Sequence, residues 1–161
     1  MSDALTIRPA TAADLPHLVD WNAAMAQETE AKALDREVLA RGVAMVFAQP
    51  RRGFYLIAEH DGVAVGGLLV TYEWSDWRNG DFWWIQSVYV LPAARRAGVF
   101  RALYADVERR ARAAGAVGIR LYVEVENERA QRTYAELGMH RCRYHMYEHP
   151  LASGENTDAQ A

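Results

Sequence analysis

The sequence has little cysteine and no long apolar run. Cys142 is the only cysteine among 161 residues, so the chain cannot form an internal disulfide bond. No apolar stretch is long enough to span a bilayer or to act as a signal peptide. The formal net charge of -3 disfavours a general binder of nucleic acid or of an anionic membrane. We therefore expect a soluble, cytoplasmic protein without a nucleic-acid or membrane partner.

Signature motifs of several common sites are also missing. The chain contains no Gly-Lys-Ser or Gly-Lys-Thr, which excludes a P-loop, and it lacks the early glycines of a Rossmann fingerprint. The five histidines show no metal-ligand spacing. His145 and His149 are four residues apart, but they lie in a predicted strand and just after it. We therefore expect no metal site.

The residues that are present fit one folded domain. A chain of 161 residues with 51% apolar side chains is long enough to bury one substantial core. The segment after Pro150 is short and mostly polar, which is typical of a frayed terminus. The sequence therefore predicts a single domain over residues 1–150 and a polar tail over residues 151–161.

Hydrophobic periodicity predicts alternating strands and helices. Asp61-Gly62 between two apolar runs predicts a β-hairpin, and either Thr11 or Asp14 can cap the first helix. Strict alternation predicts strands over residues 119–126 and 139–149. The predicted order is strand, two helices, three strands, helix, strand, helix and strand, which describes an α+β domain with a mixed sheet.

One junction carries the clearest site signal. Arg95, Arg96, Ala97 and Gly98 stand between a β-like run and a long amphipathic helix. A glycine lets the backbone approach a ligand closely, and the first N–H groups of a helix have no intrahelical acceptor. The helix dipole and the two arginines add positive charge at the same place. The junction therefore predicts a site for phosphate oxygens, although a solvated basic loop has the same composition.

With its flanking strand and helix, this junction resembles the acetyl-CoA signature of the GNAT superfamily of N-acetyltransferases. The family pattern is Arg or Gln, two residues, Gly, one residue, then Gly or Ala. Arg95 and Gly98 match it, whereas Phe100 stands where a small residue is expected. We expect the Phe100 ring to turn into the core.

Two further segments carry the same resemblance. Residues 7–18 resemble the first strand and helix of the family, and Asn127, Ala130 and Tyr134 resemble its N-x-x-A-x-x-x-Y motif. The likeness covers residues 5–148. It implies a three-layer α/β/α domain with a central mixed, largely antiparallel sheet of six to seven strands, splayed at the cofactor site. It also implies acetyl-CoA as co-substrate.

The resemblance also implies where acetyl-CoA binds. The backbone from residue 96 to residue 101 would hold the pyrophosphate, and the strand at residues 88–90 would pair with the pantetheine arm. The N–H of Val88 would face the carbonyl oxygen that becomes an oxyanion. The implied cofactor-binding residues are Val88, Tyr89, Val90, Arg95, Arg96, Ala97, Gly98, Val99, Phe100, Arg101, Asn127, Ala130 and Tyr134.

Two proton transfers are needed when an amine attacks a thioester. Tyr134 is the candidate acid for the departing thiolate, because a phenol can protonate a thiolate to which it is hydrogen-bonded. Some relatives carry a glutamate base on the strand over residues 82–90, but this chain has none there. Glu73 and Glu28 are the candidate bases, ahead of Glu30, although solvated surface carboxylates are commoner.

Two other groups of residues allow a chemical role. Trp74, Trp77, Trp83 and Trp84 can form an aromatic wall for an acceptor, or equally a packed sheet face or a dimer contact. Cys142 alternates with apolar residues, so we expect it to be a buried strand residue.

The sequence therefore predicts an acetyl-CoA-dependent N-acetyltransferase that transfers its acetyl group directly to an amine in a ternary complex. The acceptor is a small-molecule or peptide amine. Three alternatives stay open: a protein N-terminal amine as acceptor, a longer acyl group, and a module that binds acetyl-CoA without turnover. Two-fold pairs are common among soluble proteins, and we expect a homodimer.

Overall fold

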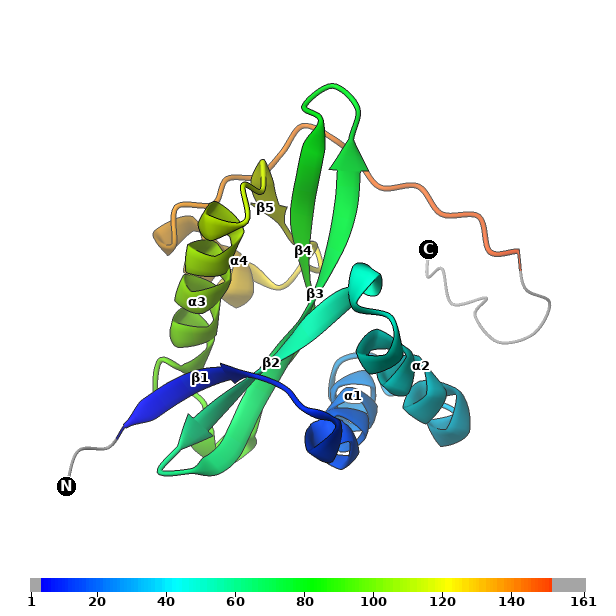
Figure 1. Cartoon of the computed structure of the whole chain (residues 1–161), viewed down its shortest axis with the longest axis vertical. Coiled ribbons are helices and arrows are strands. Elements are labelled where there is room, and N and C mark those ends of the chain that lie inside the picture. The colour runs from blue at the N-terminus through cyan, green and yellow to red at the C-terminus, as the bar shows by residue number, and fades with distance from the viewer. Residues whose placement is uncertain (1–3, 152–161) are drawn as a thin grey trace. The chain divides into compact units, whose positions relative to one another are not determined.

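The computed structural model describes residues 4–151. The chain divides into two compact units, residues 1–122 and residues 123–161. The first unit contains a five-stranded sheet in the order β1-β2-β3-β4-β5. Four strands are antiparallel to their neighbours, and β5 runs parallel to β4 (Figure 1). The strands are β1 (Leu5–Pro9), β2 (Gly53–His60), β3 (Val63–Ser75), β4 (Gly80–Val90) and β5 (Gly118–Arg120).

The predicted hairpin joins β2 to β3. Asp61 and Gly62 form its turn with φ of 50° and 79°. Positive φ at both positions is the backbone of the tight hairpin turn that Asp-Gly favours. The turn prediction is confirmed.

Helices cover both faces of the sheet (Figure 1). On one face, α1 and α2 enclose a core in which Leu18, Trp21 and Val43 meet Tyr55 and Ile57 of β2. Leu103 and Val107 of α3 are fully buried on the other side, as is Leu68 of β3. The helices are α1 (Leu15–Glu30), α2 (Arg36–Ala48) and α3 (Val99–Ala113).

The second unit contains α4 (Glu128–Glu136). Asn127 caps it, since its Oδ1 accepts a hydrogen bond of 3.1 Å from the N–H of Ala130. Gly138, with φ of 89°, follows the last turn. Both ends of this helix agree with the sequence prediction.

The predicted strand over residues 139–149 is wrong, because the structure has no strand there. Alternation gives a strand only where a partner supplies hydrogen bonds, and this segment pairs with none. The strand predicted over residues 119–126 is also shorter, because β5 ends at Arg120. The sheet therefore has five strands among the described residues, fewer than the six to seven expected. Cys142 is exposed, which corrects the prediction of a buried strand residue.

An ion pair joins β1 to the start of α1. Arg8 donates Nη1 and Nη2 to the two carboxylate oxygens of Asp14, at 2.8 Å and 2.9 Å. Asp14 also accepts the backbone N–H of Thr11 at 2.8 Å, and it is only 5% exposed. The hydrogen bonds from Arg8 are the main reason that the pKa of Asp14 falls from 3.8 to about 2. A paired, buried carboxylate of this kind stabilises the fold while it is ionised.

We expect Asp14→Asn to lower the free energy of unfolding at pH 7 by about 2 kcal/mol, because each unit of pKa shift corresponds to about 1.4 kcal/mol. The lowered pKa means that this contribution is complete above about pH 4 and is lost as the pH falls toward 2. Urea denaturation of both proteins at pH 7 and pH 3 measures it. Asp20→Asn is the control, since its pair with Arg36 is exposed. Equal losses for the two variants would contradict the account.

Candidate functional site

The centre of β4 contains a β-bulge. Gly67 pairs with Tyr89 and Leu69 pairs with Gln86, so that Leu68 alone faces Ser87 and Val88. Ser87 has φ of 50°, a value that a residue with a side chain seldom adopts. Bulges leave one residue of the ladder unpaired and are frequent beside active sites. The bulge therefore frees backbone groups at residues 87 and 88.

Two glycines of β3 pack closely against the backbones of the neighbouring strands, Gly66 against β4 and Gly67 against β2. A Cβ on Gly66 would lie 2.7 Å from the carbonyl oxygen of Tyr89. A Cβ on Gly67 would lie 2.6 Å from the carbonyl oxygen of Leu56. Glycine inside a strand often marks a close backbone approach. The Gly66-Gly67 pair therefore indicates close backbone packing on both sides of β3.

Beyond the bulge, β4 has a free edge. Its parallel pairing with β5 covers three pairs and ends at Trp84 and Arg120. No described strand pairs with residues 85–90 on that side of β4. An unpaired edge presents backbone N–H and C=O groups to any extended chain that carries amides.

The segment after β4 leads into an uncapped helix. Arg96 and Gly98 have φ of 66° and 76°, and α3 begins at Val99. No side chain caps this start, and a Cβ on Gly98 would meet no atom within 4 Å. The N–H groups of the first turn therefore have no capping side chain, and they lie at the positive end of the helix dipole. Such a start binds phosphate oxygens, and it contains the predicted residues 96–101.

Arg95 makes its contacts within the protein. Its Nε donates to the carbonyl oxygen of Val90 at 2.9 Å, and its Nη2 donates to Oε2 of Glu28 at 2.7 Å. The guanidinium also lies 5.5 Å from the centre of the Tyr89 ring. Glu28 completes the group by accepting the hydroxyl of Tyr89 at 2.8 Å. The end of α1 is thereby joined to both β4 and the loop before α3.

These contacts bear on Glu28 as a candidate base. The hydrogen bonds from Tyr89 and Arg95 lower the pKa of the Glu28 carboxyl. Burial, followed by the contact with Glu28, raises the pKa of the Tyr89 hydroxyl. A lower pKa makes a carboxylate a weaker proton acceptor.

Other predicted cofactor residues lie on the same segments. Tyr89 is 8% exposed and belongs to the core, whereas Val88 and Val90 are half-buried. The ring of Phe100 lies 6.3 Å from the ring of Tyr104 and is half-buried, so it packs along α3. Ala97 and Arg101 are exposed.

Glu73, the other candidate base, lies beside Trp84. Its Oε1 accepts the indole N–H of Trp84 at 2.7 Å and Nη1 of Arg120 at 3.2 Å. Nearby, Gln86 donates its Nε2 to Oγ1 of Thr71 at 2.5 Å. Residues at i and i+2 of a strand share a face, so Glu73 and Thr71 project from the same side of β3.

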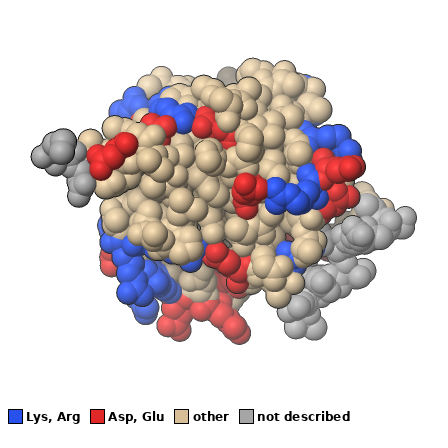
Figure 2. Space-filling view, turned by 90° about the horizontal axis from the view of Figure 1, so that it is seen from below, with Lys and Arg blue, Asp and Glu red and all other residues tan. Residues whose placement is uncertain are grey.

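The tryptophans of the possible aromatic wall differ in their exposure. Trp83 is buried, whereas Trp74 and Trp77 are 63% and 88% exposed. Trp83 packs edge-on against Phe54 and Tyr72, which fits the packed-face interpretation. Charged side chains of both signs alternate in small groups on the face shown in Figure 2.

Residues 4–151 contain neither a helix that could span a membrane nor a cluster of metal-ligating side chains. No helix in this part of the chain combines the length and the apolar character needed to cross a bilayer. No three or more His, Cys, Asp or Glu side chains gather there as metal ligands would.

The second unit contains the other predicted motif. Asn127 caps α4, and Ala130 and Tyr134 follow it on that helix. Burial raises the pKa of the Tyr134 phenol, so this group stays protonated at neutral pH. A protonated hydroxyl can donate to an anion.

The bulge, the free strand edge and the uncapped helix start together fit a phosphate-bearing chain with amides. A model of the acetyltransferase (GNAT) family matches residues 15–139. The chain belongs to the acetyltransferase (GNAT) family. Membership confirms the predicted family and fold class, and it implies acetyl-CoA as the co-substrate of this GNAT chain.

Individual relatives agree with that membership. A possible acetyltransferase from Clostridium difficile 630 is 42% identical, with a TM-score of 0.86 over 92% of this chain and 99% of that chain. Mycothiol acetyltransferase from Frankia casuarinae is 39% identical over 72% of this chain. The GNAT chain spans about a third of that curated relative, 35%.

A more distant structure shares the fold. Ribosomal-protein-alanine N-acetyltransferase from Brucella melitensis biovar Abortus 2308 has a TM-score of 0.75 and 18% identity. The match covers 92% of this chain and 100% of that chain.

We expect Glu28→Gln to weaken the binding of acetyl-CoA by about two- to fivefold, because Arg95 loses the charge that holds the loop before α3. Calorimetric titration of acetyl-CoA measures this affinity. Glu30→Gln is the matched control, since Glu30 lies in the same helical turn and accepts no hydrogen bond within residues 4–151. An unchanged affinity for Glu28→Gln would mean that the loop keeps its shape without this pair.

Proposed function

We propose that this GNAT chain transfers an acetyl group from acetyl-CoA to a primary amine by direct attack in a ternary complex. The observation that carries the proposal is the β4 bulge at Ser87. It lies beside a free strand edge and is followed, within the same unit, by the uncapped start of α3. These elements fit the carbonyl, the amides and the pyrophosphate of acetyl-CoA, in that order along the chain.

We also propose that residues 1–150 form one N-acetyltransferase domain, with residues 151–161 as its tail. The family match over residues 15–139 crosses the boundary between the two units at residue 122, which supports one functional domain. Homodimerisation and a cytoplasmic location stay predictions.

Backbone atoms would make most contacts to acetyl-CoA. The edge of β4 from Val88 to Val90 would pair with the amides of the pantetheine arm. The N–H of Val88, beside the bulge, would donate to the thioester oxygen as it gains negative charge. The N–H groups at the start of α3, together with the exposed Arg96, would hold the pyrophosphate.

Side chains would move the protons. Tyr134 would donate its hydroxyl proton to the departing thiolate, which is supported by its protonated state at neutral pH and by the family motif. The family motif implies that Asn127 and Ala130 also contact acetyl-CoA. Glu28 is the weaker candidate base, because the hydrogen bonds from Tyr89 and Arg95 lower the pKa of its carboxyl. Glu73 is therefore the preferred base.

A second candidate function is an acetyl-CoA-binding module without turnover. The ion pairs of both candidate bases, Glu28 with Arg95 and Glu73 with Arg120, favour it. Two measurements separate the two functions. One is thiol release from acetyl-CoA across a panel of amines that includes a peptide N-terminus, and the other is acetyl-CoA binding. Binding without release on every amine would support the module.

We expect Tyr134→Phe to lower the turnover number by about 10²- to 10⁴-fold, the usual contribution of general acid catalysis, if thiolate departure limits the rate. The ring and its packing stay, so the affinity for acetyl-CoA changes little. Steady-state acetyl transfer and acetyl-CoA binding are measured on the same preparations. Full turnover in the variant would remove Tyr134 from the mechanism, and lost binding would identify it as a core residue.

We expect Glu73→Gln to lower kcat/KM most at low pH, where the free amine is scarce, and a higher pH to restore part of the rate. The pH profile of kcat/KM measures this effect. Glu28→Gln provides the comparison, because its effect should fall on cofactor affinity. A wild-type profile for Glu73→Gln would leave water or the backbone to accept the proton.

A further inference from the structure

A cleft in the first unit lies outside the acetyl-CoA elements. It has a volume of about 770 Å³ and opens between the end of α2, the turn at Pro50–Arg52 and strand β3. Its lining residues are Val46, Arg51, Arg52, Thr71 and Tyr72. No acidic residue lines it, so the cleft is basic.

The turn that carries the two arginines is held firmly in place. Pro50 begins it, and Arg52 donates its backbone N–H and its Nε to the carbonyl oxygen and Oε1 of Gln49, at 2.9 Å and 2.6 Å. Gly53 follows it with φ of 151°, and a Cβ there would lie 2.0 Å from the carbonyl oxygen of Val70. Only glycine allows this turn to lie so close to β3. The backbone that carries both arginines, and the side chain of Arg52, are therefore held in place before any ligand arrives.

Both guanidinium groups have unused hydrogen-bonding capacity. Within residues 4–151, Arg51 makes no ion pair or side-chain hydrogen bond, and Arg52 bonds only to neutral Gln49. The other residues that line the cleft, Val46, Thr71 and Tyr72, carry no charge. A planar guanidinium matches the two oxygens of a carboxylate or phosphate.

The cleft connects with the bulge through one hydrogen bond. Thr71, which lines the cleft, accepts the Nε2 of Gln86 at 2.5 Å. Gln86 directly precedes Ser87, where β4 bulges. One wall of the cleft is therefore joined by a side-chain contact to the residue that precedes the bulge.

We infer that this cleft selects the acceptor by binding an oxyanion, a carboxylate or a phosphate, carried by the same molecule as the reactive amine. The inference rests on the proposed acetyl transfer and names its substrate class. Arg51 and Arg52 bind the oxyanion at the outer end, and the amine extends along Thr71 and Gln86 toward β4. Glu28 does not oppose this charge, because Arg95 neutralises it.

Matched pairs of amines test the inference. Tyrosine is compared with tyramine, and O-phosphoethanolamine with ethanolamine, so that each pair differs only in its oxyanion. We expect the wild type to favour the anionic member of at least one pair by about tenfold in kcat/KM. The pair that shows the preference distinguishes a carboxylate site from a phosphate site.

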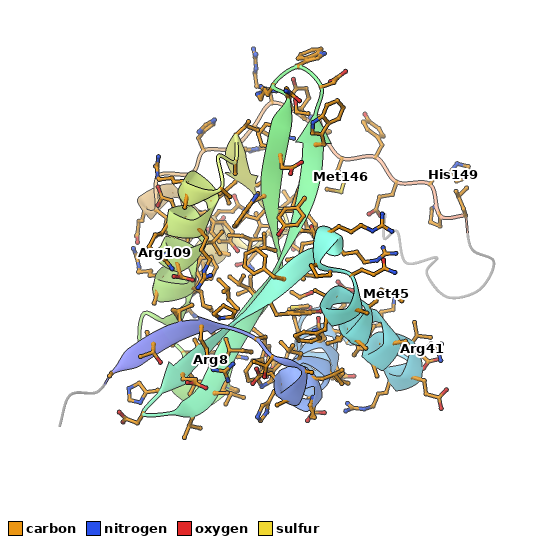
Figure 3. All side chains as sticks on the ribbon, viewed as in Figure 1. Arg8, Arg41, Met45, Arg109, Met146 and His149 are labelled. Atoms are coloured by element: carbon orange, nitrogen blue, oxygen red, sulfur yellow. The ribbon has the colours of Figure 1, made fainter. Side chains whose placement is uncertain are left out.

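Variants of the arginines make the test specific. Arg51→Ala and Arg52→Ala should raise KM for the anionic amine about tenfold, while leaving kcat and the KM of the neutral amine unchanged. Arg51→Lys keeps the charge and should restore part of the preference. Arg41→Ala is the control, since Arg41 is an exposed arginine on α2 that points away from the sheet in Figure 3. All of these side chains are exposed, so folding is little affected.

A binding arm separates the failure of this inference from the failure of acetyl transfer. Calorimetry with N-acetyltyrosine and with N-acetylethanolamine O-phosphate, in the presence of coenzyme A, needs no turnover. If either product binds and Arg51→Ala weakens that binding tenfold, the result supports the cleft even if no amine is acetylated. If neutral amines are acetylated as well as anionic ones, and neither alanine variant alters KM or product binding, the inference is wrong while acetyl transfer stands.

Discussion

The break in register between β3 and β4 is the constraint on which the proposed site depends. One residue, Leu68, faces two residues of β4, and Ser87 takes a φ of 50° to accommodate the difference. A backbone of this kind costs about 1–3 kcal/mol and persists only where the surroundings enforce it. Gly66 provides the close approach to β4, while paired strands continue on both sides of the break. The result is a rigid strand with unpaired backbone groups at one point.

The second constraint is the contact between α1 and the loop before α3. Arg95 is held at once by Glu28, by the carbonyl of Val90 and by the ring of Tyr89. This fixes the backbone that leads to Gly98 and leaves Arg96, with no ion pair in the described residues, for a phosphate. Because Glu28 belongs to α1, this ion pair links a helix that covers the sheet to the loop before α3.

Local signals in the sequence predicted much of this structure. Asp61-Gly62 identified the hairpin, Gly98 the start of α3, and Asn127 the cap of α4, because each depends on neighbouring residues. The bulge could not be predicted in the same way, since it depends on the register of two strands. The ion pair of Arg95 could not be predicted either, because Glu28 lies 67 residues away in sequence. Residues 139–149 alternate as a strand does, but they form none because no neighbouring strand pairs with them.

The central claim is that the backbone of β4 and the start of α3 bind acetyl-CoA, and one titration tests it most directly. Acetyl-CoA is added to ¹⁵N-labelled protein, and the amide resonances are followed. If this backbone binds acetyl-CoA, the largest shifts will fall on Val88 to Val90 and on residues 97–101, whose N–H groups would contact the cofactor. Saturable shifts confined to other segments, with these amides unmoved, would contradict the claim.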